Sequence, residues 1–226
     1  MSHGLEVLIE RLGVSISQDL LTQALTHRSH SYENGNQPNN ERLEFLGDSV
    51  LGFVVTAELY KRFGELQEGE LSSLKNSVVS AKALAEVAAG IDIGSFLLLG
   101  KGEEKTGGRD KGNLLADAFE AILGAIYVEH GLTRASELVE RFIFPLLDNH
   151  IDLLLNSEPK TKLQEIAQER GLAAPAYETT HTGPDHDRIF SATVTVGEVV
   201  SAGEARSRKG AESEAAIAAI KALGGN

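Results

Sequence analysis

The apolar residues of this chain change their spacing near residue 175, and this change limits its possible folds more than any other feature. No alternation of apolar and polar residues typical of a strand occurs before residue 175. Later, Phe190, Ala192, Val194 and Val196 alternate with polar residues. A helix buries one face with a period of 3.6 residues and a strand with a period of two. The sequence therefore predicts a multi-domain chain in which an all-α domain precedes an α+β domain.

The second part of the chain predicts the order αβββα. An amphipathic helix is expected over 160–170, strands over 177–181, 189–196 and 198–205, and an alanine-rich helix over 207–223. Residues 153–159 (LLLNSEP) form the expected linker. We therefore predict a first domain at 1–152, a linker at 153–159 and a second domain at 160–226.

Residues 40–55 are expected to form the first part of one helix in the first domain, and this part carries an acidic stripe. Glu41, Glu44 and Asp48 stand at i, i+3 and i+7, within a sector of about 60°. Phe45 lies just beyond the acids, and the opposite side carries Leu43, Leu46, Val50, Phe53 and Val54. Such a helix packs on more than one side, and its mutually repelling acids need a compensating charge. A divalent metal ion is the simplest source of that charge.

A second acidic pair lies on another apolar helix, expected over 113–127. Asp117 and Glu120 stand at i and i+3. The alternative for either acidic set is a solvated helix face or an ordinary acid at a helix start. Two such sets within long apolar helices favour a metal site. Oxygen ligands suit Mg²⁺ or Mn²⁺ rather than zinc, since the chain has no Cys.

The remaining pattern of the first domain also predicts helices. Short helices are expected at 5–12 and 19–26, the acidic helix should end at Gly64, and one long helix should cover 71–89. Residues 100–112 are rich in glycine and charge and predict a loop, in which Arg109 and Lys111 either contact phosphate or are solvated. Gly131 should break the helix that follows.

Two of these segments carry a family resemblance. Residues 40–51 (NERLEFLGDSVL) resemble the signature of ribonuclease III, and residues 115–127 (LADAFEAILGAIY) resemble its second acidic segment. The resemblance extends from about residue 5 to 223 and is to the bacterial type, with a nuclease domain and a double-stranded-RNA-binding domain. It implies an endoribonuclease that cleaves double-stranded RNA by Mg²⁺-dependent hydrolysis, for which Mn²⁺ can substitute. The implied products carry 5′-phosphate and 3′-hydroxyl ends, and the implied substrates are rRNA and mRNA precursors.

The resemblance also assigns roles in the first domain. Glu44, Asp48, Asp117 and Glu120 would hold the metal, with Asp48 and Glu120 as catalytic residues. Glu41 would support the dimer and the cleft, Glu68 would contact RNA near the cleavage centre, and Arg109 is a further supporting candidate. One acidic cluster per chain and two RNA strands to cut imply a homodimer with a two-fold axis. Phe45 is the candidate interface residue, because it is apolar on an acidic side of the helix.

In the second domain the resemblance points to three regions that contact RNA. Gln164 and Glu165 would reach one minor groove, where 2′-hydroxyls are displayed, and the loop 183–186 with His186 would reach the next. Ser207, Arg208 and Lys209 would contact phosphates at the start of the last helix, where free N–H groups favour an anion. The alternative for Arg208 and Lys209 is an ordinary solvated basic pair.

The net charge of −12 argues at first against a nucleic-acid partner. However, residues 1–159 carry 13 basic and 24 acidic side chains, whereas residues 160–226 carry 8 and 9. The acidity is thus concentrated around the expected metal site, and any RNA-binding surface must be a local patch. There is no long apolar stretch, no signal peptide and no cysteine, which favours a cytoplasmic protein with no membrane partner.

Three alternatives remain open at this point. The chain could be a double-stranded-RNA-binding module with an inactive nuclease site, or a scaffold of the ribosome-processing machinery. His27 could be a general base, although hydrogen bonding and packing are the favoured roles. The complete set of carboxylates favours an active nuclease over the first two alternatives.

Overall fold

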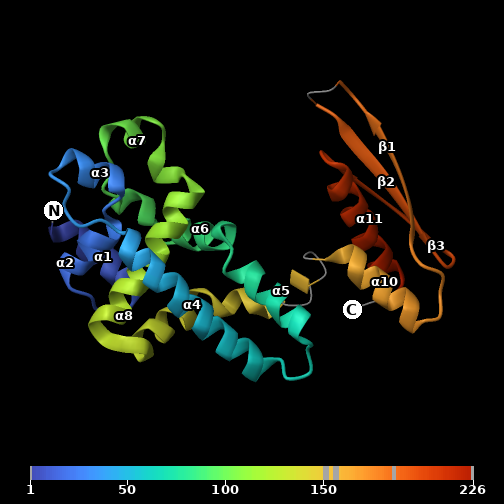
Figure 1. Ribbon diagram of the computed structural model, residues 1–226, viewed down its shortest axis with the longest axis horizontal. Helices are drawn as coiled ribbons and strands as arrows, with labels where there is room; N and C mark the ends of the chain where they lie inside the picture. Colours follow the sequence, from blue (N-terminus) through green and yellow to red (C-terminus); the bar gives the residue numbers. More distant parts are fainter. Residues whose placement is uncertain (1, 150–152, 155–157, 185–186, 225–226) are drawn as a thin grey trace. The chain divides into compact units, whose positions relative to one another are not determined.

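The computed structural model describes residues 2–149, 153–154, 158–184 and 187–224. The chain divides into two compact units, residues 1–148 and 149–226. In the described part of the first unit the regular structure is helical apart from one isolated bridge between Thr26 and Leu98. The described part of the second unit contains a sheet packed against helices (Figure 1). The predicted fold class is therefore confirmed. The exact domain ends at 152 and 160 stay a prediction.

The first unit consists of α-helices joined by short 3₁₀ turns. The α-helices are α1 (Ser2–Leu12), α2 (Gln18–Leu25), α3 (Arg28–Glu33), α4 (Glu41–Arg62), α5 (Glu68–Val78), α6 (Ala81–Gly90), α7 (Lys101–Lys105) and α8 (Gly112–Phe142). The 3₁₀ turns are η1 (Ile93–Phe96), η2 (Gly108–Asp110) and η3 (Phe144–Asn149). None of the described helices is long and apolar enough to cross a membrane.

The two longest helices, α4 and α8, pack against each other and form the centre of this unit (Figure 1). They approach most closely at two glycines. A Cβ atom added at Gly47 would lie 1.8 Å from the Glu120 carbonyl oxygen, and one added at Gly124 would lie 2.1 Å from the Leu43 carbonyl oxygen. Any side chain here would push the helices apart. Leu51 and Phe119 are fully buried in the surrounding core.

The expectation of one helix over 71–89 is wrong, because the chain breaks between α5 and α6. Ser80 has an extended backbone, and its hydroxyl accepts a hydrogen bond from the Ala83 N–H at 3.3 Å. Serine competes for backbone groups in this way and therefore begins a new helix. Helix α5 also starts earlier than expected, because the Glu70 carboxylate accepts the Gln67 N–H at 3.1 Å in a capping box.

The segment 100–112 is also more ordered than the expected loop, since it contains α7 and η2. The Glu33 carboxylate accepts the Lys101 N–H at 2.9 Å and thereby caps the first turn of α7. The predicted break at Gly131 is confirmed. This residue has φ 76° and ψ −172°, which are not helical angles, and α8 is kinked there.

The second unit contains α10 (Pro159–Glu169), a sheet of β1 (Ala176–Thr182), β2 (Ile189–Val196) and β3 (Val199–Ala205), and α11 (Arg208–Ala222). The strands are antiparallel in the order β1-β2-β3, with Tyr177 opposite Val194 and Val194 opposite Ser201. Ala192, Val194 and Val196 are buried against α10 and α11, whereas the residues between them on β2 are more exposed. The strand alternation predicted from the sequence thus follows the buried face.

Candidate metal centre and nucleic-acid interface

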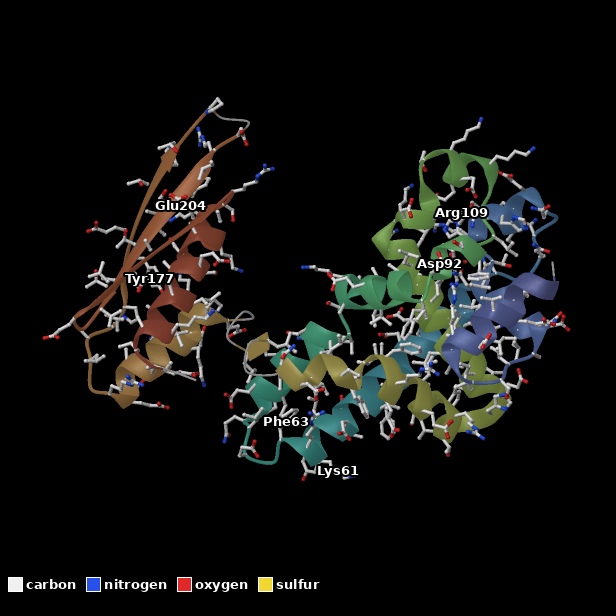
Figure 2. The ribbon with its side chains drawn as sticks, turned by 180° about the vertical axis from the view of Figure 1, so that it is seen from behind. Lys61, Phe63, Asp92, Arg109, Tyr177 and Glu204 are labelled. Atoms are coloured by element: carbon white, nitrogen blue, oxygen red, sulfur yellow. The ribbon has the colours of Figure 1, made fainter. Side chains whose placement is uncertain are left out.

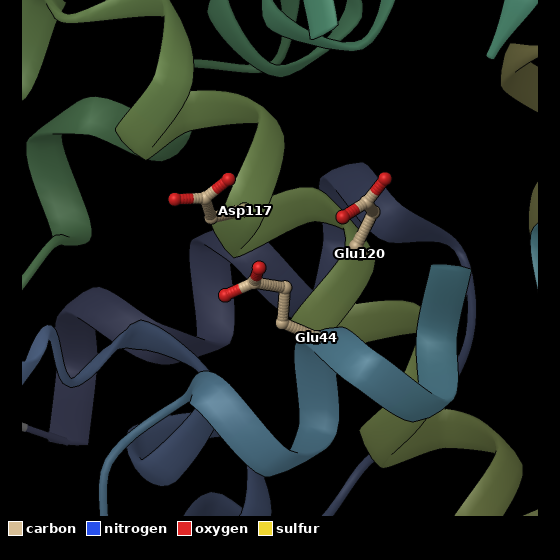
Figure 3. A group of neighbouring side chains, drawn as sticks. All are labelled: Glu44, Asp117 and Glu120. Atoms are coloured by element: carbon tan, nitrogen blue, oxygen red, sulfur yellow. The ribbon is translucent and has the colours of Figure 1, made fainter. Parts of the chain in front are cut away.

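Three of the predicted metal ligands converge between α4 and α8. Glu44, Asp117 and Glu120 each bring one carboxylate oxygen within 4.8 Å of the others (Figure 3). Asp117 and Glu120 are neighbours on α8 because they are three residues apart. Glu44 reaches them because the contact between Gly47 and Gly124 lies one turn further along each helix. The glycine contact therefore allows acids from two helices to share one site.

The electrostatics of this group favour the uptake of a cation. Burial, followed by the charges of Asp48, Glu44 and Asp117, raises the pKa of Glu120 to about 7. Burial is also the main cause that raises the pKa of Glu44 and of Asp117. Half-buried carboxylates that repel one another bind either protons or a metal ion. Oxygen donors alone are the ligands preferred by Mg²⁺ and Mn²⁺, so the residues present fit such an ion.

Asp48, the fourth predicted ligand, is exposed and lies outside this group of three. Its charge nevertheless raises the pKa of both Glu44 and Glu120, so it lies close to them. Asp48 also lines a hollow of about 500 Å³ beside Lys75. Its assignment as a metal ligand and catalytic residue stays a prediction.

A cleft of about 500 Å³ opens over the acidic group. Its lining residues are His27, Arg28, Asn40, Glu41, Glu44, Glu103, Lys111, Asn113, Leu114 and Asp117. Glu41 lines the cleft and lies 3.8 Å from Arg28, and its supporting role stays a prediction. Glu103 was not among the residues singled out from the sequence. It pairs with Lys111 across a segment that sequence patterns predict only as a loop.

His27 caps α3 within the wall of this cleft. Its Nδ1 lies 2.8 Å from the Ser29 hydroxyl and accepts the Ser29 N–H at 3.3 Å. The Ser29 hydroxyl in turn accepts the Gly100 N–H at 2.9 Å. Burial lowers the pKa of His27. These contacts agree with the favoured hydrogen-bonding role of this residue.

Arg109 and Glu68 lie elsewhere in the structure and do not line the cleft. The Arg109 guanidinium pairs with Glu104 at 2.7 and 2.9 Å and donates to the Gly94 carbonyl at 2.9 Å (Figure 2). Its contacts thus hold η1, α7 and η2 together. Glu68 begins α5 and accepts a hydrogen bond from the Ser72 hydroxyl at 2.9 Å. Of the two cations singled out in this segment, Lys111 is the one that lines the cleft.

Phe45 belongs to an exposed aromatic stripe on α4. Its side chain is 78% exposed, Phe53 is 59% exposed and Tyr60 is 77% exposed. The expectation that Phe53 lies on the buried side is wrong. Phe53 stands about 80° around the helix from Leu43, at the edge of the apolar face, where it is left uncovered.

The residues predicted to contact RNA lie on α10 and at the start of α11. Gln164 and Glu165 are exposed. The Ser207 hydroxyl caps α11 by accepting the Gly210 N–H at 3.1 Å, and Lys209 is exposed. The Arg208 side chain is 70% exposed, although its Nε–H is bonded to Glu212. His186 lies outside the described residues.

Comparisons with known proteins agree with the division of the chain into two units. Residues 17–147 match the ribonuclease-III-like family, and residues 159–223 match the double-stranded RNA binding motif. The chain is 51% identical to ribonuclease 3 of Mycolicibacterium smegmatis over 99% of both chains. It is also 51% identical to ribonuclease 3 of Streptomyces coelicolor, covering 94% of this chain and 78% of that one.

A solved structure supports the same assignment. The nuclease domain of ribonuclease III from Campylobacter jejuni, described with structural flexibility in a region involved in dimer formation, is 40% identical with a TM-score of 0.59. The match covers 62% of this chain and 96% of that one. Together with the acidic group between α4 and α8, these matches show that the chain belongs to the ribonuclease III family of endonucleases acting on double-stranded RNA.

Proposed function

We propose that this chain hydrolyses double-stranded RNA with the help of Mg²⁺ held by Glu44, Asp117 and Glu120, with Asp48 as a further acid. The observation that carries the proposal is the convergence of three carboxylates within 4.8 Å from two helices. Burial is the main cause that raises the pKa of all three carboxyl groups, so a divalent ion would replace protons that they otherwise retain. Mn²⁺ takes the same oxygen donors and should substitute.

The residues of the site have distinct tasks in this reaction. A bound divalent ion would lower the pKa of a water molecule and offset charge on the leaving 3′-oxygen. Glu44 of α4 and Asp117 of α8 would hold the ion. Asp48 and Glu120 are the acids assigned to catalysis. Without the ion, burial and the neighbouring acids raise the pKa of Glu120 to about 7, so binding of the ion at neutral pH would displace a proton from this residue. In-line attack of water on phosphorus with cleavage of the P–O3′ bond gives 5′-phosphate and 3′-hydroxyl ends, and the family resemblance adds a short 3′ overhang.

We further propose a homodimer built on the aromatic stripe of α4. Phe45, Phe53 and Tyr60 lie within a sector of about 80° and are all exposed in the single chain. Large exposed aromatic side chains in a row are typical of an interface. Two centres related by a two-fold axis would allow both strands of a duplex to be cut.

The second unit anchors the duplex in this proposal. Exposed Gln164 and Glu165 on α10 suit contacts to 2′-hydroxyls, and the start of α11 suits contacts to phosphates. Processing of rRNA and mRNA precursors in the cytoplasm is the setting that the family resemblance and the absence of cysteine support. A module with an inactive site or a scaffold would have no need for the acidic group.

Incubation of a long RNA duplex with the protein in Mg²⁺ or in EDTA tests the proposal. Sizing should show short products in Mg²⁺ alone, and mass spectrometry should find 5′-phosphates and 3′-hydroxyls. Glu140→Gln, which changes an exposed acid on the same helix α8, is the matched control and should cleave normally. Equal cleavage in EDTA, or products with 3′-phosphates, would contradict the proposed chemistry.

A further inference from the structure

The second unit contains a buried carboxylate that joins three of its elements. Glu212 on α11 is 7% exposed. Its oxygens lie 2.5 Å from the Lys160 Nζ of α10, 2.9 Å from the Arg208 Nε one turn earlier, and 3.3 Å from the Thr179 hydroxyl of β1. A buried charge is tolerated only when it is paired and hydrogen-bonded, and Glu212 meets both conditions.

The surroundings of Glu212 keep it ionised. Hydrogen bonds from Lys160 and then from Arg208 lower its pKa. Tyr177, which packs on the core beneath the helices, has its ring 4.8 Å from the Lys160 Nζ (Figure 2). Burial and the charge of Glu212 raise the pKa of Tyr177 to about 12. The carboxylate thus stays charged and keeps both cations beside it at neutral pH.

One of these contacts involves Arg208, which was proposed to touch RNA, and another involves Lys160, which lies beside the proposed contact residue Gln164. Lys160 and Gln164 are four residues apart and share a face of α10. Arg208 uses its Nε–H for Glu212, which leaves its terminal N–H groups available on a side chain that is 70% exposed. Glu212 therefore connects the α10 face that carries Gln164 to the α11 start that carries Arg208.

We propose that Glu212 is a positioning residue for duplex RNA, which holds Lys160 and Arg208 so that the α10 face and the α11 start meet the duplex together. The inference rests on the proposed phosphate contact by Arg208. A double-stranded-RNA-binding domain reads shape, by touching two minor grooves and the phosphates between them. A fixed spacing between its contact points should therefore contribute more to the affinity for the duplex than one additional positive charge does.

A charge-only account of Glu212 predicts the opposite result. Glu212 is a negative charge directly beside two cations. If only the net charge mattered, its removal would strengthen binding to phosphates and increase the salt dependence. If Glu212 positions Arg208 and Lys160, its removal weakens binding despite the gain in positive charge. The sign of the change in affinity decides between these accounts.

The test measures affinity of the full chain for an RNA duplex in EDTA, which prevents cleavage under the proposed mechanism. Glu212→Gln should weaken binding by about fivefold, the equivalent of one hydrogen bond. Glu214→Gln removes the same charge from an exposed position on α11 and should leave binding equal or slightly tighter. In an Arg208→Ala background, Glu212→Gln should have a smaller further effect, because only Lys160 is then left for Glu212 to position. Circular dichroism and thermal unfolding establish that each variant is folded.

A second measurement needs no variant at Glu212. The Arg208 Nε–H should give an NMR resonance that is protected from exchange with water, and this protection should persist when RNA is added. Loss of protection on RNA binding, or unchanged or tighter binding by folded Glu212→Gln, would overturn the positioning role. Unchanged binding by Arg208→Ala would instead overturn the proposed phosphate contact on which the inference rests.

Discussion

Glu120 shows how its surroundings change the chemistry of one residue. In the folded chain its pKa is about 7, above the ordinary value of 4.5. The folded state therefore holds a proton that the unfolded chain releases between these two values. The stability gained from this proton is complete below about pH 4.5 and is lost as the pH rises through about 7. Without metal, the chain should become less stable over this range.

Thermal unfolding in EDTA between about pH 5 and pH 7.5 checks this expectation. The melting temperature of the unmutated chain should fall over this range, and Mg²⁺ should reverse most of the fall at the upper end. Glu120→Gln cannot titrate at this position, so its melting temperature should depend less on pH. An equally steep dependence in both proteins would show that Glu120 is not the titrating group.

Substitution of Asp48 tests whether this fourth predicted acid belongs to the catalytic site. Asp48→Ala should reduce the rate of cleavage by about 10³ or more, since metal-assisted catalysis supplies several kcal/mol, and it should leave duplex binding nearly unchanged. Single-turnover cleavage and a binding measurement in EDTA separate the two effects. A variant that cleaves at the normal rate would remove Asp48 from the catalytic group.

The sequence identified the site residues whose grouping follows from their local spacing. It missed the contacts that depend on tertiary packing. Glu44, Asp117 and Glu120 were singled out because their spacing on two helices is local information, and they do converge. The pairing of Arg109 with Glu104 and the carbonyls of η1 depends on how distant turns meet. Glu212 was overlooked for the same reason, since its partner Lys160 lies on another element.

At the scale of elements, helix α4 was predicted well and the segment that follows α5 was not. The apolar period of α4 and the signal to end near Gly64 agree with a helix over Glu41–Arg62. The break at Ser80 was missed because serine is tolerated within helices as well as at their starts. Only the hydrogen bond to the Ala83 N–H shows which role it has.

The exposed stripe of α4 leads to a prediction about assembly. Phe45→Asp should place a charge in the proposed interface and shift the chain from dimer to monomer, because a buried unpaired charge is costly. Sedimentation velocity measures the change. Val200→Asp is the matched control, because Val200 is 65% exposed on β3 of the second unit, which contributes no residue to the stripe, and it should leave the dimer intact. A dimeric Phe45→Asp variant would rule out this face.

At the scale of the whole molecule, the two units should have separable tasks. A chain that ends near residue 157 should stay folded and dimeric, because the core of the first unit lies within residues 1–148. It should cleave weakly at low salt and lose most of its affinity for duplex, because residues 1–157 carry 13 basic and 23 acidic side chains, and this net negative charge repels phosphate. Duplex binding by the truncated and full-length chains measures this. Equal affinity would show that the second unit is not the anchor.

The order of elements in the second unit could be predicted because each element has its own local pattern of apolar residues. The strand alternation in particular gave the β2 range correctly as Ile189–Val196. The approach of α4 to α8 could not be predicted in this way. A glycine in a helical pattern has several explanations, and the close contact with the Glu120 carbonyl is visible only in three dimensions.

The crossing of α4 and α8 also restricts how the gene can vary. Every single-nucleotide change that converts a glycine codon to that of another amino acid adds a Cβ atom. At Gly47 and Gly124 that atom would lie within 2.1 Å of a backbone oxygen. Every missense mutation at these two codons should therefore disturb the packing of α4 on α8. At Gly52 on the same helix α4, it would lie 3.6 Å from the flexible end of Lys75. In a library of single-nucleotide variants selected for cleavage, missense changes should therefore disappear from codons 47 and 124, while alanine at codon 52 persists.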